Sequence, residues 1–151
     1  MSKHEQKIKD GAKPFLEAGE EVLAAFVARP RGWTQAAAGS ATLGGVQQGR
    51  AYSAGEEAEF RLASPMALAV TPRRLLSLRI SSPIGLGIGG DVKELVSAVP
   101  IADVDSIEVK RLALGKVVTV TVRGVPVKLE ANAKADASGL AEAFERAKAT
   151  A

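Results

Sequence analysis

The residues from Gly85 to Gly90 have the spacing G-x-G-x-x-G, a pattern that could carry chemistry. In dinucleotide-binding folds, such glycines allow a tight turn and let a pyrophosphate approach the backbone at the start of a helix. A predicted strand precedes this loop, but Pro100 leaves room for only about eight helical residues after it. Nucleotide binding through this loop is therefore the weakest function that we consider. We expect instead a flexible strand connection, able to pack against a partner.

Four arginines lie beside predicted turns and could bind an anion. Arg29 and Arg31 flank a turn marked by Pro and Gly, and Arg73 and Arg74 lie in a turn between two strands. If these loops gather at one end of a barrel, their guanidinium groups could hold a phosphate through paired hydrogen bonds. This favours peripheral binding to anionic phospholipid as an alternative function. The other interpretation is that the arginines solvate the ends of loops.

Residues for catalysis or metal binding are scarce. The chain has no cysteine, and its single histidine, His4, falls in a charged N-terminal segment. A nucleophile–histidine pair therefore cannot be assembled in an ordered site. Asp103 and Asp105 are close in sequence, but at the start of a strand they are typical of turn-forming residues. The sequence predicts no enzyme, no cofactor and no metal.

Composition and charge limit the classes of partner that the chain could bind. The 151 residues carry a formal net charge of +3, with one Trp, one Tyr and no run of Lys or Arg longer than two. Nucleic-acid modules usually show a denser basic surface or stacking aromatics, so the sequence argues against nucleic acid as a partner. The charged N-terminus is unlike a signal peptide, and no stretch of ~18 apolar residues suggests a spanning helix. We expect a cytoplasmic protein, with peripheral membrane contact as the alternative.

The hydropathy pattern predicts a β-rich domain. Residues 1–14 form a charged tail, either frayed helix or mobile, and 15–151 form one domain with an Ala/Gly-rich insertion at 34–64. A closing helix should begin at Asp136 or Ser138, both suitable N-caps. About seven antiparallel strands should form a barrel or sandwich that this helix caps. Alternating apolar residues place strands at 22–27, 66–70, 75–80, 104–110, 117–122 and 125–130, and residues 91–99 form a short strand or a turn of helix.

The insertion contains small residues at helical spacing. Ala37, Ala41, Gly45, Gly49 and Ser53 recur every four residues, so a helix would carry them as one ridge. Such ridges let two backbones approach closely. Each Gly also costs a helix about 1 kcal/mol, so a loop, a packed helix and a membrane-touching segment all remain open. The ridge and the glycine loop together favour self-association.

Two segments resemble bacterial pleckstrin-homology-like (PH-like) domains, a group that includes GRAM-related modules, and especially the small uncharacterised versions from high-GC bacteria. Residues 69–76, AVTPRRLL, are similar to the strand–turn–strand "alTnrRLl" of that group, and residues 99–107, VPIADVDSI, to its "iplsdIxsI". The resemblance implies a strongly bent seven-stranded sheet closed by the C-terminal helix. It also allows a structural role for Arg74, tied to a carbonyl or a carboxylate.

The function that we expect is therefore a non-enzymatic binding or assembly module. Protein–protein contact, and self-association in particular, is the leading interpretation, with the ridge at 37–53 as its surface. The PH-like resemblance implies no activity, because one fold can host lipid sites, peptide sites and scaffolds.

Overall fold

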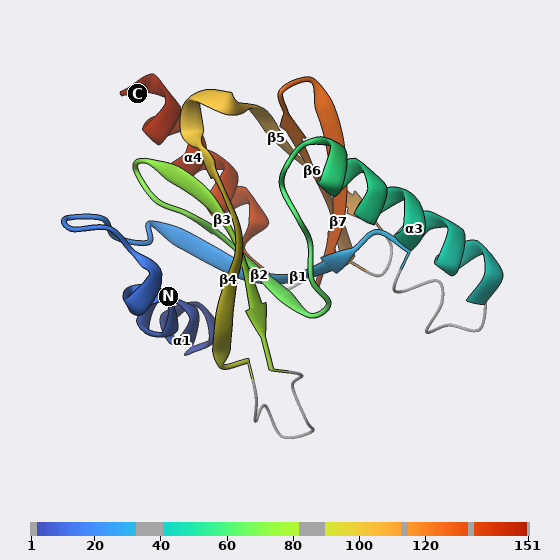
Figure 1. Cartoon of the computed structure of the whole chain (residues 1–151), viewed down its shortest axis with the longest axis horizontal. Helices are drawn as coiled ribbons and strands as arrows, with labels where there is room; N and C mark the ends of the chain where they lie inside the picture. The colour runs from blue at the N-terminus through green and yellow to red at the C-terminus, as the bar shows by residue number, and fades with distance from the viewer. Residues whose placement is uncertain (1–2, 33–40, 82–89, 113–114, 133–134, 151) are drawn as a thin grey trace.

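The computed structural model describes residues 3–32, 41–81, 90–112, 115–132 and 135–150, which form one bent sheet with helices packed around it (Figure 1). Predictions that fall on the other residues, Ala37 among them, lie outside this description. In chain order the elements are α1 (Lys3–Ala12), η1 (Lys13–Phe15), β1 (Ala24–Pro30), α3 (Ala41–Glu57), β2 (Met66–Val70), β3 (Arg74–Ile80), β4 (Val92–Pro100), η2 (Ile101–Asp103), β5 (Val104–Leu112), β6 (Gly115–Val122), β7 (Val125–Ala131) and α4 (Ala137–Ala149).

The seven strands form one antiparallel sheet in the order β4-β3-β2-β1-β7-β6-β5. Strands β1–β4 make one meander and β5–β7 make a second. The two meanders join where Ala28–Pro30 of β1 pairs with Leu129–Ala131 of β7. The prediction of about seven antiparallel strands is confirmed, and residues 92–100 take the strand form rather than the helical turn.

The alternation of apolar residues places one core inside the bend of the sheet. Phe26, Leu68 and Leu129 point to this side, where α4 covers them with Leu140 and Phe144. The side chain of Asp136 accepts a hydrogen bond from the Gly139 amide at 2.9 Å, which fixes the start of α4. The predicted capping helix and its N-cap are therefore confirmed.

Helix α1 covers the opposite face of the sheet (Figure 1). Ile8 and Ala12 are buried in the same apolar cluster as Ala67, Ala69 and Leu76, and the helix lies closest to β1 and β4. This segment, expected to be a frayed helix or a mobile tail, instead forms a helix that packs on the sheet. The physical reason is that Ile8 and Ala12 form an apolar side of this charged helix, and Gly11 lets the helix lie close to Val92 of β4. Strand β2 is consequently buried on both faces.

The Ala/Gly-rich insertion contains the helix α3, which lies beside β7 and the end of β1 (Figure 1). Its packed face is made of small residues, since Gly44, Ala51 and Gly55 are buried. Gly32, with φ of +107°, passes so close to α3 that a Cβ there would lie 2.5 Å from the Gly44 carbonyl oxygen. Of the three structures left open for this segment, the helix is the one that forms.

Strand β1 also runs further than its hydropathy predicted. The expected turn at Pro30 is part of the strand, because Pro30 pairs with Leu129 at the junction of the two meanders.

Among the described residues, no helix is both long and apolar enough to cross a membrane.

Candidate functional site

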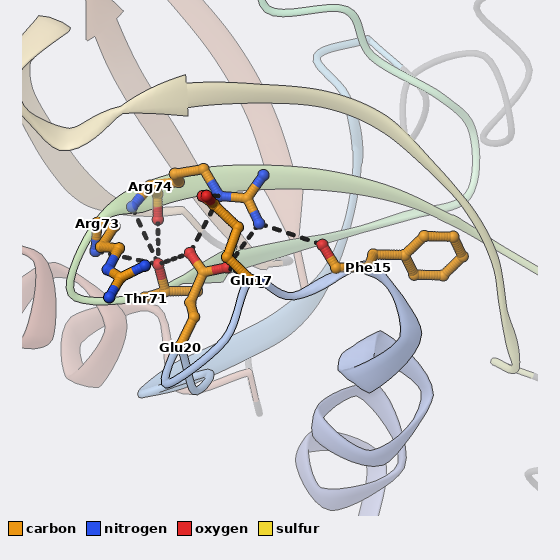
Figure 2. A network of polar contacts seen from close by, with 6 residues as sticks. All are labelled: Phe15, Glu17, Glu20, Thr71, Arg73 and Arg74. Carbon is orange, nitrogen blue, oxygen red and sulfur yellow. Dashed lines mark hydrogen bonds and ion pairs between the residues drawn. The ribbon is translucent and has the colours of Figure 1, made fainter.

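A buried carboxylate network lies where the β2–β3 turn meets the segment before β1 (Figure 2). Arg74 donates from Nη2 to Glu20 Oε1 at 2.6 Å and from Nε to Glu20 Oε2 at 3.0 Å. The Thr71 hydroxyl donates to Glu20 Oε2 at 2.6 Å, and Arg74 also donates to the Phe15 carbonyl oxygen at 3.1 Å. The Glu20 side chain is fully buried. These contacts connect the N-terminal segment to the sheet.

The electrostatics of this network match a structural role. The hydrogen bonds from Arg74 lower the pKa of Glu20 to about 2, because they outweigh the burial that would raise it. The carboxylate in turn raises the pKa of Arg74. Arg74 is thus bound to a carboxylate and a carbonyl within its own chain, which is the structural role that the resemblance allowed. Glu20 was not singled out in the sequence, since nothing in its local pattern shows its distant partner.

The four candidate arginines fall into two pairs at opposite ends of β1. Arg73 is exposed at the β2–β3 turn, near the strand end where Ala24 pairs with Val70. Arg29 and Arg31 lie at the other end of β1, beyond the pairing of Ala28 with Met66. The structure does not bring the four together, so a shared anion site built from all of them stays an expectation without geometric support.

Arg31 lines a cleft of about 410 Å³ between α3 and β7. The polar wall of this cleft consists of Arg31, Gln47, Arg50 and Lys128. Ala51, Ala54 and Pro126 supply the remaining apolar wall. Arg50 and Lys128 have no joint signal in the sequence, because they lie 78 residues apart and only the packing of α3 on β7 brings them to the same cleft.

A second carboxylate fixes the position of Arg31 at the edge of this cleft. Glu130, which is buried, accepts from Arg31 Nη1 at 2.6 Å and from the Gly32 amide at 2.7 Å. The Arg31 amide donates to the Lys128 carbonyl oxygen at 3.1 Å. The chain is therefore held on β7 at the point where it leaves the sheet.

The outer face of α3 carries the described part of the small-residue ridge. Gly45, Gly49 and Ser53 are exposed, and a Cβ added at either glycine would meet no atom within 4 Å. Ala41 lies within α3 in the same i, i+4 series. The same helix exposes large apolar groups, with Leu43 61%, Val46 49% and Tyr52 37% accessible.

The remaining candidates give no catalytic arrangement. Asp103 binds Arg123 at 2.9 Å and Asp105 accepts from the Gly124 amide at 2.7 Å, so both hold the β6–β7 turn. No cluster of three or more His, Cys, Asp or Glu suited to a metal occurs in the part of the chain that the structure describes.

Most of the glycine loop lies outside the described residues, whereas the strand after it, β4, is described. Strand β4 pairs with β3, so the helix N-terminus that a dinucleotide site needs is not formed by residues 92–100. The nucleotide-binding alternative therefore lacks its structural context.

Comparison with known proteins identifies the fold. No family model and no curated protein matches the sequence. Among solved structures, a DUF1696 family protein with a pleckstrin-homology domain from Shewanella loihica superposes with a TM-score of 0.51 and 11% identity, over 95% of this chain and 92% of that one. The chain has a PH-like fold. A pleckstrin homology domain from Shewanella amazonensis gives a TM-score of 0.48 and 14% identity, over 95% and 86% of the two chains.

The PH-like fold agrees with the resemblance carried by residues 69–76 and 99–107. It is consistent with a binding module, while the ligand or partner depends on the surfaces of this chain.

Proposed function

We propose that this PH-like domain acts as a non-enzymatic assembly module that associates with a second copy of itself through the outer face of α3. The observation that carries the proposal is the concentration of exposed apolar groups on this helix. Of the four large apolar side chains exposed among the described residues, Leu43, Val46 and Tyr52 belong to α3. Clustered exposed apolar groups are typical of interaction surfaces.

The ridge explains how a second helix would fit there. Gly45 and Gly49 leave open space above the backbone, and Ser53 continues the same line. Without side chains in the way, two α3 helices can approach to the short distance seen in small-xxx-small pairs. A pair of identical faces related by a two-fold axis is the commonest arrangement of homo-oligomers.

The presence of glycine at two exposed helical positions supports the same proposal. Each costs a helix about 1 kcal/mol relative to Ala, and neither packs against its own domain. A close contact with a second helix would require small residues at these positions, whereas packing within the domain does not.

The test compares solution mass by sedimentation velocity over a range of concentrations. We expect the native chain to exceed the mass of one copy and the double variant Gly45→Leu/Gly49→Leu to fall to it. Leucine favours helix over glycine by up to about 1 kcal/mol, so the melting temperature of the variant should not fall. Glu142→Leu, on the exposed side of α4, is the matched control and should leave the mass unchanged. A native chain that stays single at every concentration would refute the proposal, as would a double variant with unaltered mass.

A further inference from the structure

The carboxyl end of α3 is fixed by contacts with residues that follow it and with a distant strand. Phe60, just beyond the helix, is fully buried, and its amide donates to the Gly55 carbonyl oxygen at 2.7 Å. Ser97 of β4 donates from its hydroxyl to the Glu59 carbonyl oxygen at 3.2 Å. The last carbonyl groups of a helix have no partner within the helix, so contacts of this kind decide where its final turn lies. The end of α3 therefore has a defined position on the sheet.

Arg123, in the β6–β7 turn, joins this end of α3 to a third part of the sheet. Its Nη1 donates to the Ala58 carbonyl oxygen at 2.9 Å, and its Nη2 donates to Asp103 Oδ2 of η2 at 2.9 Å. The Arg123 amide donates to the Asp103 carbonyl oxygen at 3.0 Å, which fixes the turn itself. A cation beside the last carbonyls of a helix also interacts favourably with the helix dipole. One guanidinium group thus connects α3, the β6–β7 turn and η2.

The backbone of this turn favours residues other than arginine. Arg123 has a φ of +48° and Gly124 a φ of +81°, and two-residue turns of this kind favour Asn followed by Gly. The side chains of Arg123 and Asp103 are 42% and 40% exposed, and exposed ion pairs contribute little to stability. Turn geometry and stability therefore do not account for an arginine here, whereas its contact with Ala58 does.

We propose that Arg123 is a positioning residue for self-association. It holds the last turns of α3, which carry Gly49, Tyr52 and Ser53, in the position where they face a second copy. A helix end that is already ordered loses less conformational freedom when a second helix docks on it, so a fixed end strengthens the contact. This inference rests on the proposed function, and Arg123 acts through Ala58 rather than on the outer face itself.

The variant Arg123→Asn separates positioning from stability. Asn followed by Gly suits this turn at least as well as Arg followed by Gly, but the asparagine side chain is too short to reach Ala58. We expect the melting temperature to change little. The dissociation constant of self-association, from sedimentation velocity over a range of concentrations, should rise about tenfold, because both copies lose the attachment. The matched control is Arg111→Gln, which removes the same charge from an exposed position on β5 and should leave the constant unchanged.

The variant Asp103→Asn tests whether Asp103 acts through Arg123. Alone, it should weaken self-association by a smaller factor, because the hydrogen bond between Arg123 and Ala58 can still form. Added to Arg123→Asn, it should weaken self-association no further. Equal effects of Asp103→Asn in both backgrounds would show that the two residues act separately, and would overturn their joint role.

Deuterium uptake at the end of α3 tests the attachment in the absence of self-association. It is measured in the Gly45→Leu/Gly49→Leu background, with and without Arg123→Asn. We expect faster uptake by residues 54–60 when Arg123→Asn is present, and unchanged uptake would overturn the proposal.

The sedimentation data distinguish the failure of this inference from the failure of the proposed function. A native chain that is single at every concentration would refute self-association and the positioning role with it. A native chain that associates, with a dissociation constant that Arg123→Asn leaves unaltered, would refute the positioning role alone. A weaker association that appears only where Arg123→Asn also lowers the melting temperature would show a purely structural role, and would overturn the proposal as well.

Discussion

Replacing Glu20 by glutamine tests whether the buried network in Figure 2 stabilises the fold as the geometry indicates. The difference between the ordinary pKa of 4.5 and about 2 in the fold corresponds to about 3 kcal/mol at neutral pH. Arg74 is partly exposed, so solvent screening lowers the expected loss for Glu20→Gln to about 2 kcal/mol. For a chain of this length, that loss lowers the melting temperature by roughly 4–8 °C.

The pH dependence makes this prediction specific. A carboxyl whose pKa is lower in the folded state contributes its full stabilisation to the fold at any pH above its unfolded pKa. That stabilisation is lost as the pH falls toward the folded pKa. The stabilisation by Glu20 is therefore lost as the pH falls from about 4.5 to about 2. The stability difference between the native chain and Glu20→Gln should shrink to less than half between pH 7 and about pH 3.

Urea denaturation at several pH values, followed by circular dichroism, measures both quantities. Glu21→Gln is the matched control, because its side chain is exposed and makes no contact in this network. Its stability should stay within about 0.5 kcal/mol of the native chain. A Glu20→Gln variant as stable as the native chain at neutral pH would refute the reasoning. A stability difference that does not change with pH would refute the charge argument and leave only packing.

Two further substitutions test the packing. Phe144→Ala should cost about 3–5 kcal/mol in chemical denaturation, because it removes a fully buried ring from the core under α4, while the exposed neighbour Glu145→Ala should cost little. Gly32→Ala should lose more stability than Gly124→Ala. Both glycines have a positive φ, and an alanine forced into that conformation costs about 1–3 kcal/mol of stability. Only at Gly32 would the added Cβ also collide with α3. Equal losses at the two glycines would contradict the close approach of α3.

The sequence was sufficient for the architecture because strands and the last helix depend on local periodicity. Alternating valines in 117–122 and the apolar face around Phe144 each predict an element without knowledge of its neighbours. The packing of helix α1 was not predicted, because its sequence is mostly charged and its contacts with β1 and β4 appear only in the folded chain. The cleft and the buried network could not be predicted from the sequence. Arg74, which binds Glu20, lies 54 residues away from it, and Lys128, which lines the same cleft as Arg50, lies 78 residues away. Only the folded chain brings each pair together.

The pairing of β1 with β7 has a consequence for how the domain opens. Only three residue pairs, from Ala28 to Pro30 on β1, connect the two meanders through the sheet. Backbone amides at such a short seam should exchange with deuterium sooner than those in the longer ladders on either side. Glu130 and Arg31 hold the chain together at this seam, next to the cleft.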